Sequence, residues 1–455
     1  MRVDRSRLPE VGADPAFRFP DIVRHTLHNG LQLRTIERRT MPVTSMVVQV
    51  DGGAVADPRG REGLAAMTAD MLDEGTGSLG AIEVSEGLAR IGARYDADAG
   101  ADVTSLSLTT LQRFAECGVA WLAELLIRPS LRSADFDRVR QMRLDRLQQL
   151  KDLPAAVAER AFLRLMYGDH AYGHLAIGDA VSLGAMTLED VTAFHARRFG
   201  PSRTTITIAG SDTHDGLLRL VDGAFSGWSD DATIDEPASA SAGQPEASSR
   251  LTVVPREGAP QSELRIGHLS ARRDSPDYPA LLVMNAVLGG EFVSRINLKL
   301  REEKGYTYGA RSGFDWRRGL APFVLRASVH TEATADAISD CLAELEGIRG
   351  PRPPSDSEMV LAKASLTRGY PRGFETAQQV ARSVARLALY GLPDTYFEEF
   401  VPRVQAVEAA DVVKVAGRYI DPARAVVLVV GDHQSIADSL SPLGLGEPNL
   451  LAADD

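Results

Sequence analysis

An arginine and a tyrosine stand seven residues apart in the segment 298–312, LKLREEKGYTYGARS. Apolar residues recur every fourth position upstream, which predicts a helix with Arg301 in its last turn and Gly305 just beyond its end. Residues 306–312 alternate as in a strand, so Tyr308 is expected near the start of that strand. A guanidinium and a phenol both donate hydrogen bonds, and a pair of such donors can stabilise negative charge that develops during a reaction.

The same two residues also have a purely structural explanation. An arginine at the end of a helix neutralises the helix dipole, and a tyrosine in a strand packs against its neighbours. Considered without their surroundings, Arg301 and Tyr308 favour this structural explanation. The elements that position them, and the rest of the chain, must decide between the two.

The bulk composition indicates a protein with at least two folded units that does not bind nucleic acid. The chain has 455 residues, of which 44% are hydrophobic, and this length is too great for a single core. Its 62 acidic and 50 basic side chains give a formal charge of -12, which repels phosphate backbones and anionic lipid surfaces.

The sequence shows no membrane-spanning or signal segment, and its two cysteines do not indicate a disulfide. No apolar run approaches the roughly 20 residues that span a bilayer, and the first residues lack the apolar core of a signal peptide. The chain as written is therefore expected to be soluble and cytoplasmic, or periplasmic if a signal peptide has been removed. Cys117 and Cys341 lie far apart in helix-like segments and are expected to be two buried thiols rather than a disulfide.

The two halves of the chain repeat one another across a linker. Residues 229–250 are rich in Ser, Ala, Asp, Pro and Gly, which is typical of a linker. Residues 190–210, DVTAFHARRFGPSRTTITIAG, align without gaps on residues 411–431, DVVKVAGRYIDPARAVVLVVG, 221 positions further on. In both segments a helix-period stretch meets a proline, and a short β-branched run then ends at a glycine. We infer an internal duplication.

We therefore predict an α+β fold made of two homologous domains, residues 18–228 and 251–445, joined by the linker 229–250. Each domain is expected to hold a mostly antiparallel sheet with helices packed on one face. The Asn29-Gly30 pair marks a hairpin turn between the first two strands of the first domain.

The opening segment belongs to a longer pattern, LGGEFVSRINLKLREEKGYTYGARS, residues 288–312. This pattern closely resembles the C-terminal half of the pitrilysin/insulinase family of zinc metallopeptidases, in which a tyrosine follows the arginine of Leu-Arg-Glu by seven residues. The resemblance extends over roughly residues 20–440. It implies that Tyr308 donates its hydroxyl to a substrate carbonyl as it becomes an oxyanion, while Arg301 holds charge and the substrate backbone.

The same resemblance predicts a zinc site in the first half, on a helix with an inverted His-x-x-Glu-His motif. The matching segment reads GLAAMTADMLDEGT, residues 63–76, and places Ala66 and Asp70 at the ligand positions and Ala69 at the catalytic glutamate. The third ligand, a later glutamate, would fall near Arg146, with a register uncertain by one residue. No plausible zinc ligand set remains, so this chain is expected to bind no metal and no other cofactor.

The resemblance therefore implies the non-metal subunit of a heterodimeric metallopeptidase, similar to the bacterial branch related to mitochondrial processing peptidase. A homologous partner would supply zinc, and this chain would supply Arg301 and Tyr308 for a peptide substrate and be inactive alone. Two alternatives stay open. One is a scaffold or peptide-binding protein without a catalytic share, and the other is a self-sufficient metallopeptidase with different ligands. His170 and His174 have metal-like spacing, but flanking glycines favour a structural loop.

Overall fold

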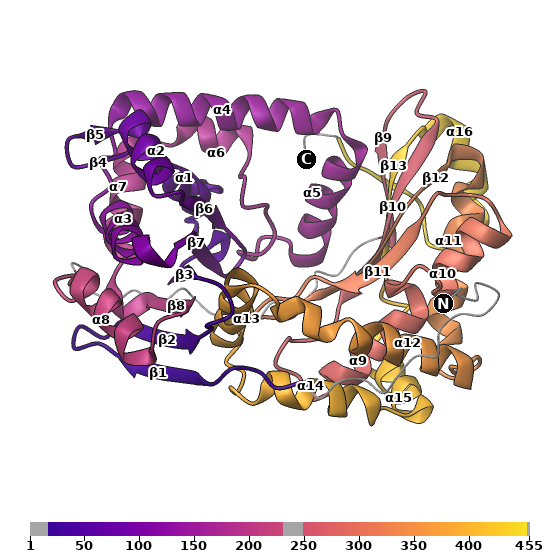
Figure 1. Cartoon of the computed structure of the whole chain (residues 1–455). Coiled ribbons are helices and arrows are strands. Elements are labelled where there is room, and N and C mark those ends of the chain that lie inside the picture. Colours follow the sequence, from indigo (N-terminus) through magenta and orange to yellow (C-terminus); the bar gives the residue numbers. More distant parts are fainter. Residues whose placement is uncertain (1–16, 231–248, 453–455) are drawn as a thin grey trace, which may run out of the picture.

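Two six-stranded sheets, one in each half of the chain, form the framework of the computed structural model (Figure 1). The structure describes residues 17–230 and 249–452. The predicted linker, 229–250, therefore lies almost entirely outside the described residues.

The first sheet has the strand order β1-β2-β8-β3-β7-β6, and only the β2–β8 pair is parallel. Gly30 has φ +89° in the predicted hairpin turn between β1 and β2, a conformation that glycine adopts readily. β6 lies at the edge of the sheet, whereas β3 is central. The strands are β1 (Ile22–Thr26), β2 (Gln32–Glu37), β3 (Val43–Asp51), β6 (Arg94–Ala99), β7 (Val103–Leu111) and β8 (Thr204–Gly210).

The second sheet has the order β11-β12-β10-β13-β9-β14, in which β9 pairs in parallel with both β13 and β14. From the opposite edge, β9-β13-β10-β12-β11 repeats the order β2-β8-β3-β7-β6 of the first sheet. The predicted duplication and the two-domain α+β fold are confirmed. The strands are β9 (Leu251–Pro255), β10 (Gln261–Leu269), β11 (Ala310–Phe314), β12 (Pro322–His330), β13 (Val426–Gly431) and β14 (Asn449–Leu450).

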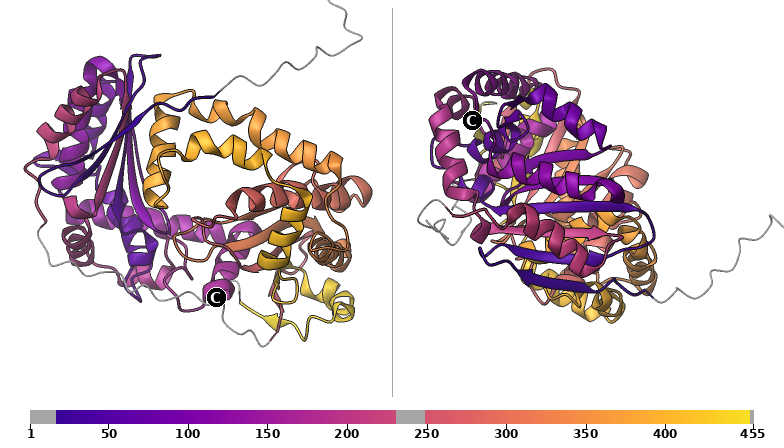
Figure 2. Two further views of the ribbon diagram at one scale, coloured as in Figure 1. Left: turned by 90° about the horizontal axis from the view of Figure 1, so that it is seen from below. Right: turned by 60° about the vertical axis from the view of Figure 1, so that its left-hand side comes forward.

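Helices cover one face of each sheet, as predicted (Figure 2). In the first half these are α1 (Leu64–Met71), α2 (Ala81–Arg90), α3 (Ala115–Ile127), α4 (Ser133–Lys151), α6 (Ala180–Ala185), α7 (Leu188–Arg198) and α8 (His214–Phe225). In the second half they are α9 (Tyr278–Asn285), α10 (Arg295–Asn297), α11 (Thr334–Gly347), α12 (Asp356–Arg368), α14 (Tyr396–Gln405), α15 (Ala409–Tyr419) and α16 (His433–Leu440).

The two halves also exchange one helix each, which the sequence did not predict. Helix α5 (Pro154–Tyr167) belongs to the first half, but its apolar side chains pack on β10 and β13 of the second sheet. Helix α13 (Ala377–Leu389) belongs to the second half and packs on β3 and β8 of the first sheet. Each helix therefore partly covers the second face of the other half's sheet, and the two halves share buried surface.

Two smaller expectations have mixed outcomes. Cys117 and Cys341 are both free thiols, but only Cys341 is buried, because Cys117 lies on the solvent side of α3. The helical stretch Tyr278–Glu303 is long and apolar enough to cross a membrane by composition alone. More than half of its apolar window is buried in the protein, as in a core helix, so it is weak evidence for a membrane span.

Candidate functional site

The helix that carries the degenerate zinc motif, α1, is held at its start by a buried carboxylate. Asp57 accepts hydrogen bonds from the backbone N–H groups of Gly63 and Ala65, both at 2.7 Å. His174 Nε2 lies 3.1 Å from the same carboxylate, so this histidine is part of a structural loop, as predicted. Burial raises the pKa of Asp57, and these contacts oppose that rise.

The surviving parts of the motif have structural explanations. Gly63 has φ +97°, and a Cβ there would lie 2.9 Å from the carbonyl oxygen of Ile177. Gly75 has φ +155°, and Thr76 donates to the carbonyl of Arg128 at 2.9 Å. Core packing holds the apolar members, which are all at most 1% exposed: Leu64, Ala65, Met71 and Leu72. The frame is therefore required for folding whether or not a metal binds.

The two ligand positions and the catalytic glutamate position of the motif are occupied by groups that do not fit a zinc site. Ala66 and Ala69 are buried methyl groups. Asp70, the remaining carboxylate, forms an ion pair with Arg143 of α4, with Nη1 and Oδ2 2.5 Å apart. Arg143 also donates to the carbonyl of Ile177 at 3.2 Å. No group of three or more His, Cys, Asp or Glu residues suited to a metal occurs among the described residues.

The third ligand position was expected near Arg146 of α4, and the structure shows how Arg146 and Arg143 of this helix differ. Arg146 is exposed and donates to Gln149 of its own helix at 3.2 Å. Arg143, one helical turn earlier, reaches Asp70 instead, and its side chain is only 12% exposed. An arginine of α4 therefore pairs with the one carboxylate that remains in the motif, and this arginine is Arg143.

A hollow of about 750 Å³ lies between α1, β6 and α4 at this place. Burial, together with the nearby charges of Glu74 and Asp70, raises the pKa of Asp73 to about 6. The hydroxyl of Tyr95 is buried without a hydrogen-bond partner among the described residues, and burial raises its pKa well above the ordinary value. The hollow is large enough for a ligand, but its charged groups include the Asp70–Arg143 ion pair.

We expect zinc to leave the thermal stability of the isolated chain unchanged. A ligand that binds only the folded state stabilises it, and the stabilisation grows with the ratio of ligand concentration to Kd. Two of the three zinc ligand positions in this chain have no ligand atom, so zinc should not bind and the midpoint of unfolding should not change. Thermal unfolding with and without excess zinc, together with metal analysis of the purified chain, measures this. A zinc-dependent rise in the midpoint would contradict the assignment.

In the second half, a network of backbone contacts fixes the segment that carries Arg301 and Tyr308. The stretches Ala286–Gly290 and Leu298–Glu303 are π-helical. A Cβ at Gly289 would lie 2.5 Å from Ser312 Oγ, so the glycine allows this turn to approach β11. Asn297 then accepts from the N–H of Ala310 at 3.0 Å, which ties the start of β11 to the helix.

Arg295, the first arginine of the pattern 288–312, connects this segment to α12. Its Nε and Nη2 lie 2.6 and 2.8 Å from the two carboxylate oxygens of Glu358 on α12. The same guanidinium donates to the carbonyls of Arg352 and Pro353 at 2.6 and 3.0 Å. The hydrogen bonds from Arg295 hold the pKa of Glu358 at about 2. The sequence pattern contained this arginine but gave no sign of its role.

Arg301 lies in the last helical turn, as predicted. Its guanidinium carbon is 4.3 Å from the ring centre of Phe292, and its Nε is 3.6 Å from Glu302. The Nη1 atom is buried and has no hydrogen-bond partner among the described residues. The guanidinium of Arg301 therefore stacks on the ring of Phe292, which is 62% exposed, while its Nη1 has no acceptor among the described residues.

Tyr308 is 90% exposed and lies on the loop between the helix and β11. The prediction that residues 306–312 form one strand is wrong for Tyr306 and Tyr308, because β11 begins only at Ala310. Gly305, with φ +67°, ends the helix as expected. The loop is anchored before and after Tyr308, since the N–H of Tyr306 donates to Leu300 at 2.8 Å and Asn297 holds Ala310.

The two sites lie in different halves of the chain. No hydrogen bond or ion pair joins residues 301–308 to α1 in the part of the chain that the structure describes. Tyr308 has neither a hydrogen bond nor a ring contact with the other described residues. Its hydroxyl is thus free to donate to a group outside this chain.

Comparisons with known proteins match both halves of the chain to one family. Residues 34–179 match the family model described as Insulinase (Peptidase family M16), and residues 185–366 match the Peptidase M16 inactive domain. An uncharacterized zinc protease of Mycobacterium tuberculosis is 26% identical over 423 residues, which cover 93% of this chain and 96% of that protein. The non-peptidase homolog YmxG of Helicobacter pylori is 21% identical and covers 83% of this chain and 86% of its own length.

Among solved structures, a peptidase M16 inactive domain from Pseudomonas fluorescens superposes with a TM-score of 0.83 at 23% identity. The match covers 90% of this chain and 98% of that one, and it supports the fold. The two family models follow one another along the chain and together span most of the two duplicated halves. The chain therefore belongs to peptidase family M16, and its later matched region is the inactive domain of that family.

Proposed function

We propose that this chain is the non-metal subunit of a heterodimeric zinc metallopeptidase and acts through Arg301 and Tyr308. One observation carries the proposal: an exposed tyrosine, whose hydroxyl has no partner among the described residues, lies on a loop that is anchored on both sides. Binding and catalytic residues concentrate on loops that a rigid scaffold positions, and an exposed hydroxyl on such a loop can donate to another molecule.

In this proposal the partner is a homologous chain with an intact zinc motif. The zinc, the glutamate base and the activated water belong to that partner, because Ala66, Ala69 and the Asp70–Arg143 ion pair provide none of them here. The substrate is a peptide held between the two subunits. Tyr308 donates its hydroxyl to the scissile carbonyl oxygen, and the unpaired Nη1 of Arg301 donates to the substrate backbone.

The proposal is tested by mixing this chain with a homologue that carries His-x-x-Glu-His in its first half. We expect the mixture to cleave an unstructured fluorogenic peptide, whereas neither chain should cleave it alone. Size-exclusion chromatography should show a one-to-one complex. Cleavage by this chain alone, or a mixture that is no faster than the partner alone, would overturn it.

A second candidate is a pseudo-peptidase that binds peptides or partners without a catalytic share. It is favoured by the contacts of Arg301 with Phe292 and Glu302, which already occupy part of this guanidinium. In that case the complex would still form, but substitutions at Arg301 and Tyr308 would leave its turnover unchanged. The substitution Tyr308→Phe therefore separates the two candidates.

A further inference from the structure

One buried amide, that of Asn297, binds both segments that carry the arginine–tyrosine pair. Its Nδ2 donates to the carbonyl of Phe292 at 2.6 Å, and its Oδ1 accepts from the N–H of Ala310 at 3.0 Å. Phe292 provides the ring on which Arg301 stacks, and Ala310 ends the loop that carries Tyr308. The two hydrogen bonds therefore connect the support of the arginine to the support of the tyrosine.

The side-chain type at position 297 suits these two partners. One partner is a backbone carbonyl and the other is a backbone N–H, and a carboxamide offers one donor group and one acceptor in a single plane. The side chain is also enclosed, since Asn297 is only 3% exposed. An apolar side chain of the same size would fill the space but would release both segments.

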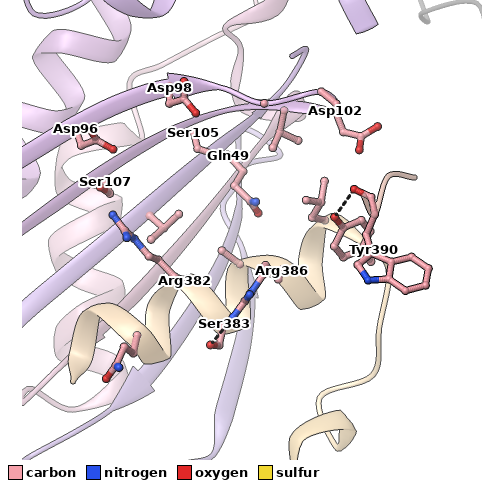
Figure 3. Close-up of a pocket in the computed structure, with 18 of the residues that line it drawn as sticks. Gln49, Asp96, Asp98, Asp102, Ser105, Ser107, Arg382, Ser383, Arg386 and Tyr390 are labelled. Carbon is pink, nitrogen blue, oxygen red and sulfur yellow. Dashed lines mark hydrogen bonds between the residues drawn. The ribbon is translucent and has the colours of Figure 1, made fainter. Parts of the chain in front are cut away.

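The far end of β11 is fixed by the first sheet and by the helix that crosses to it. Just beyond the strand, the carbonyl of Trp316 accepts from the hydroxyl of Tyr390 on α13 at 3.2 Å, at the edge of a cavity of about 590 Å³ (Figure 3). The N–H of Arg318 donates to the buried Asp102 at 3.1 Å. Because these contacts hold the far end, the position of the tyrosine loop depends on contacts at the start of the strand.

Within the loop, the hydroxyl of Thr307 connects the two sides of Tyr308. This hydroxyl accepts from the N–H of Gly309 at 3.1 Å and donates to the carbonyl of the same residue at 3.0 Å. Thr307 is only 9% exposed, whereas Tyr308 projects into solvent. A shift of Ala310, the next residue, therefore carries the tyrosine with it.

We propose that Asn297 is a positioning residue that sets the place of the Tyr308 hydroxyl relative to the guanidinium of Arg301. This inference rests on the proposed function, because it concerns the site at which these two donors would meet one substrate. Donors that stabilise a developing oxyanion must be in place before the reaction, and a misplacement of about 1 Å can cost about 100-fold in rate. Asn297 touches no reacting atom and acts only through the two residues that it supports.

Asn297→Leu in the mixed enzyme tests the proposal. We expect kcat to fall at least 10-fold, because both hydrogen bonds are lost and the tyrosine moves. In a chain that already carries Tyr308→Phe, the same substitution should lower kcat by a factor at least threefold smaller, since the hydroxyl that it displaces is absent. A substitution that only weakened the fold would lower kcat by the same factor in both chains. If leucine is not accommodated, Asn297→Ala breaks the same bonds and should show the same pattern.

Asn285→Leu is the matched control. The amide of Asn285 also makes two hydrogen bonds to β11, since Nδ2 donates to the carbonyl of Ser312 at 3.0 Å and Oδ1 accepts from the hydroxyl of Ser312 at 2.7 Å. In the described part of the chain, no hydrogen bond joins it to Phe292 or to residues 304–310. We expect a loss of stability in urea similar to that of Asn297→Leu, with kcat within threefold of the wild type.

Amide hydrogen exchange of the isolated chain tests the positioning without any activity. Exchange at Gly309 and Ala310 should be at least 10-fold faster in Asn297→Leu and within threefold of the wild type in Asn285→Leu, because only the first substitution removes the acceptor of the Ala310 N–H. Unchanged exchange in Asn297→Leu, or an equal loss of kcat with and without the Tyr308 hydroxyl, would overturn the positioning role. Faster exchange together with a Tyr308→Phe enzyme of normal kcat would support the positioning and refute the proposed function.

Discussion

Replacing Tyr308 with phenylalanine is expected to lower the turnover of the mixed enzyme about 100-fold or more. The hydroxyl would donate to the carbonyl oxygen only as that oxygen gains negative charge, so its loss raises the barrier of the chemical step. The effect should appear in kcat, with little change in KM. Steady-state kinetics of the reconstituted heterodimer on a fluorogenic peptide measures both constants.

The neighbouring loop provides a matched control for this substitution. Tyr306→Phe removes the same atom from the same loop, but that hydroxyl donates to Asp336 of α11 at 3.3 Å. Its loss should change kcat less than threefold, since this exposed hydrogen bond to a carboxylate is made within the chain and contributes nothing to the reaction. If Tyr308→Phe also left kcat within that range, the catalytic assignment would be wrong and the pseudo-peptidase would be favoured.

The largest expected effect on stability comes from Arg295. Replacing it with methionine removes two hydrogen bonds to Glu358 and two to backbone carbonyls, and leaves those acceptors partly buried. We expect the free energy of unfolding to fall by about 2–4 kcal/mol, measured by urea denaturation. Arg90→Met, which breaks an exposed pair with Glu86 one turn away on α2, should cost less than about 0.5 kcal/mol.

The same ion pair between Arg295 and Glu358 makes stability depend on pH in a defined window. Arg295 lowers the folded-state pKa of Glu358 from its ordinary value of 4.5 to about 2. A carboxylate with a depressed pKa contributes stability that is fully present above pH 4.5 and is lost as the pH falls through about 2. Arg295→Met and Glu358→Gln should both flatten this part of the stability curve. A variant curve parallel to that of the wild type between pH 5 and pH 2 would contradict the assignment.

The sequence was sufficient for the duplication because an identical strand and helix pattern recurs at a fixed spacing, and hydrophobic periodicity is a local property. The degenerate zinc motif could also be recognised from the sequence, because ligand and base chemistry depends on side-chain type, and alanine at positions 66 and 69 provides neither. The helix end at Gly305 followed from the same local reasoning, since glycine readily adopts the positive φ that ends a helix.

Other features depended on contacts between distant segments. Residues 143 and 146 are both arginines of one helix, and only the packing of α4 against α1 decides which of them faces Asp70. Tyr308 alternates with its neighbours like a strand residue, yet the tie between Asn297 and Ala310 starts β11 later and leaves Tyr308 in a loop. The strand prediction failed, and the arginine that pairs with Asp70 could not be assigned, because a periodic pattern gives the spacing of side chains but not their partners.

The sequence by itself determined two homologous halves, a degenerate metal motif and an arginine–tyrosine pair at the end of a helix. Only the tertiary structure decided that α5 and α13 cross to the opposite sheet, and that Arg295 binds Glu358 while Arg301 Nη1 has no hydrogen-bond partner among the described residues. An amphipathic helix encodes an apolar face but not the sheet that will cover it, so such a crossing has no signature in the sequence.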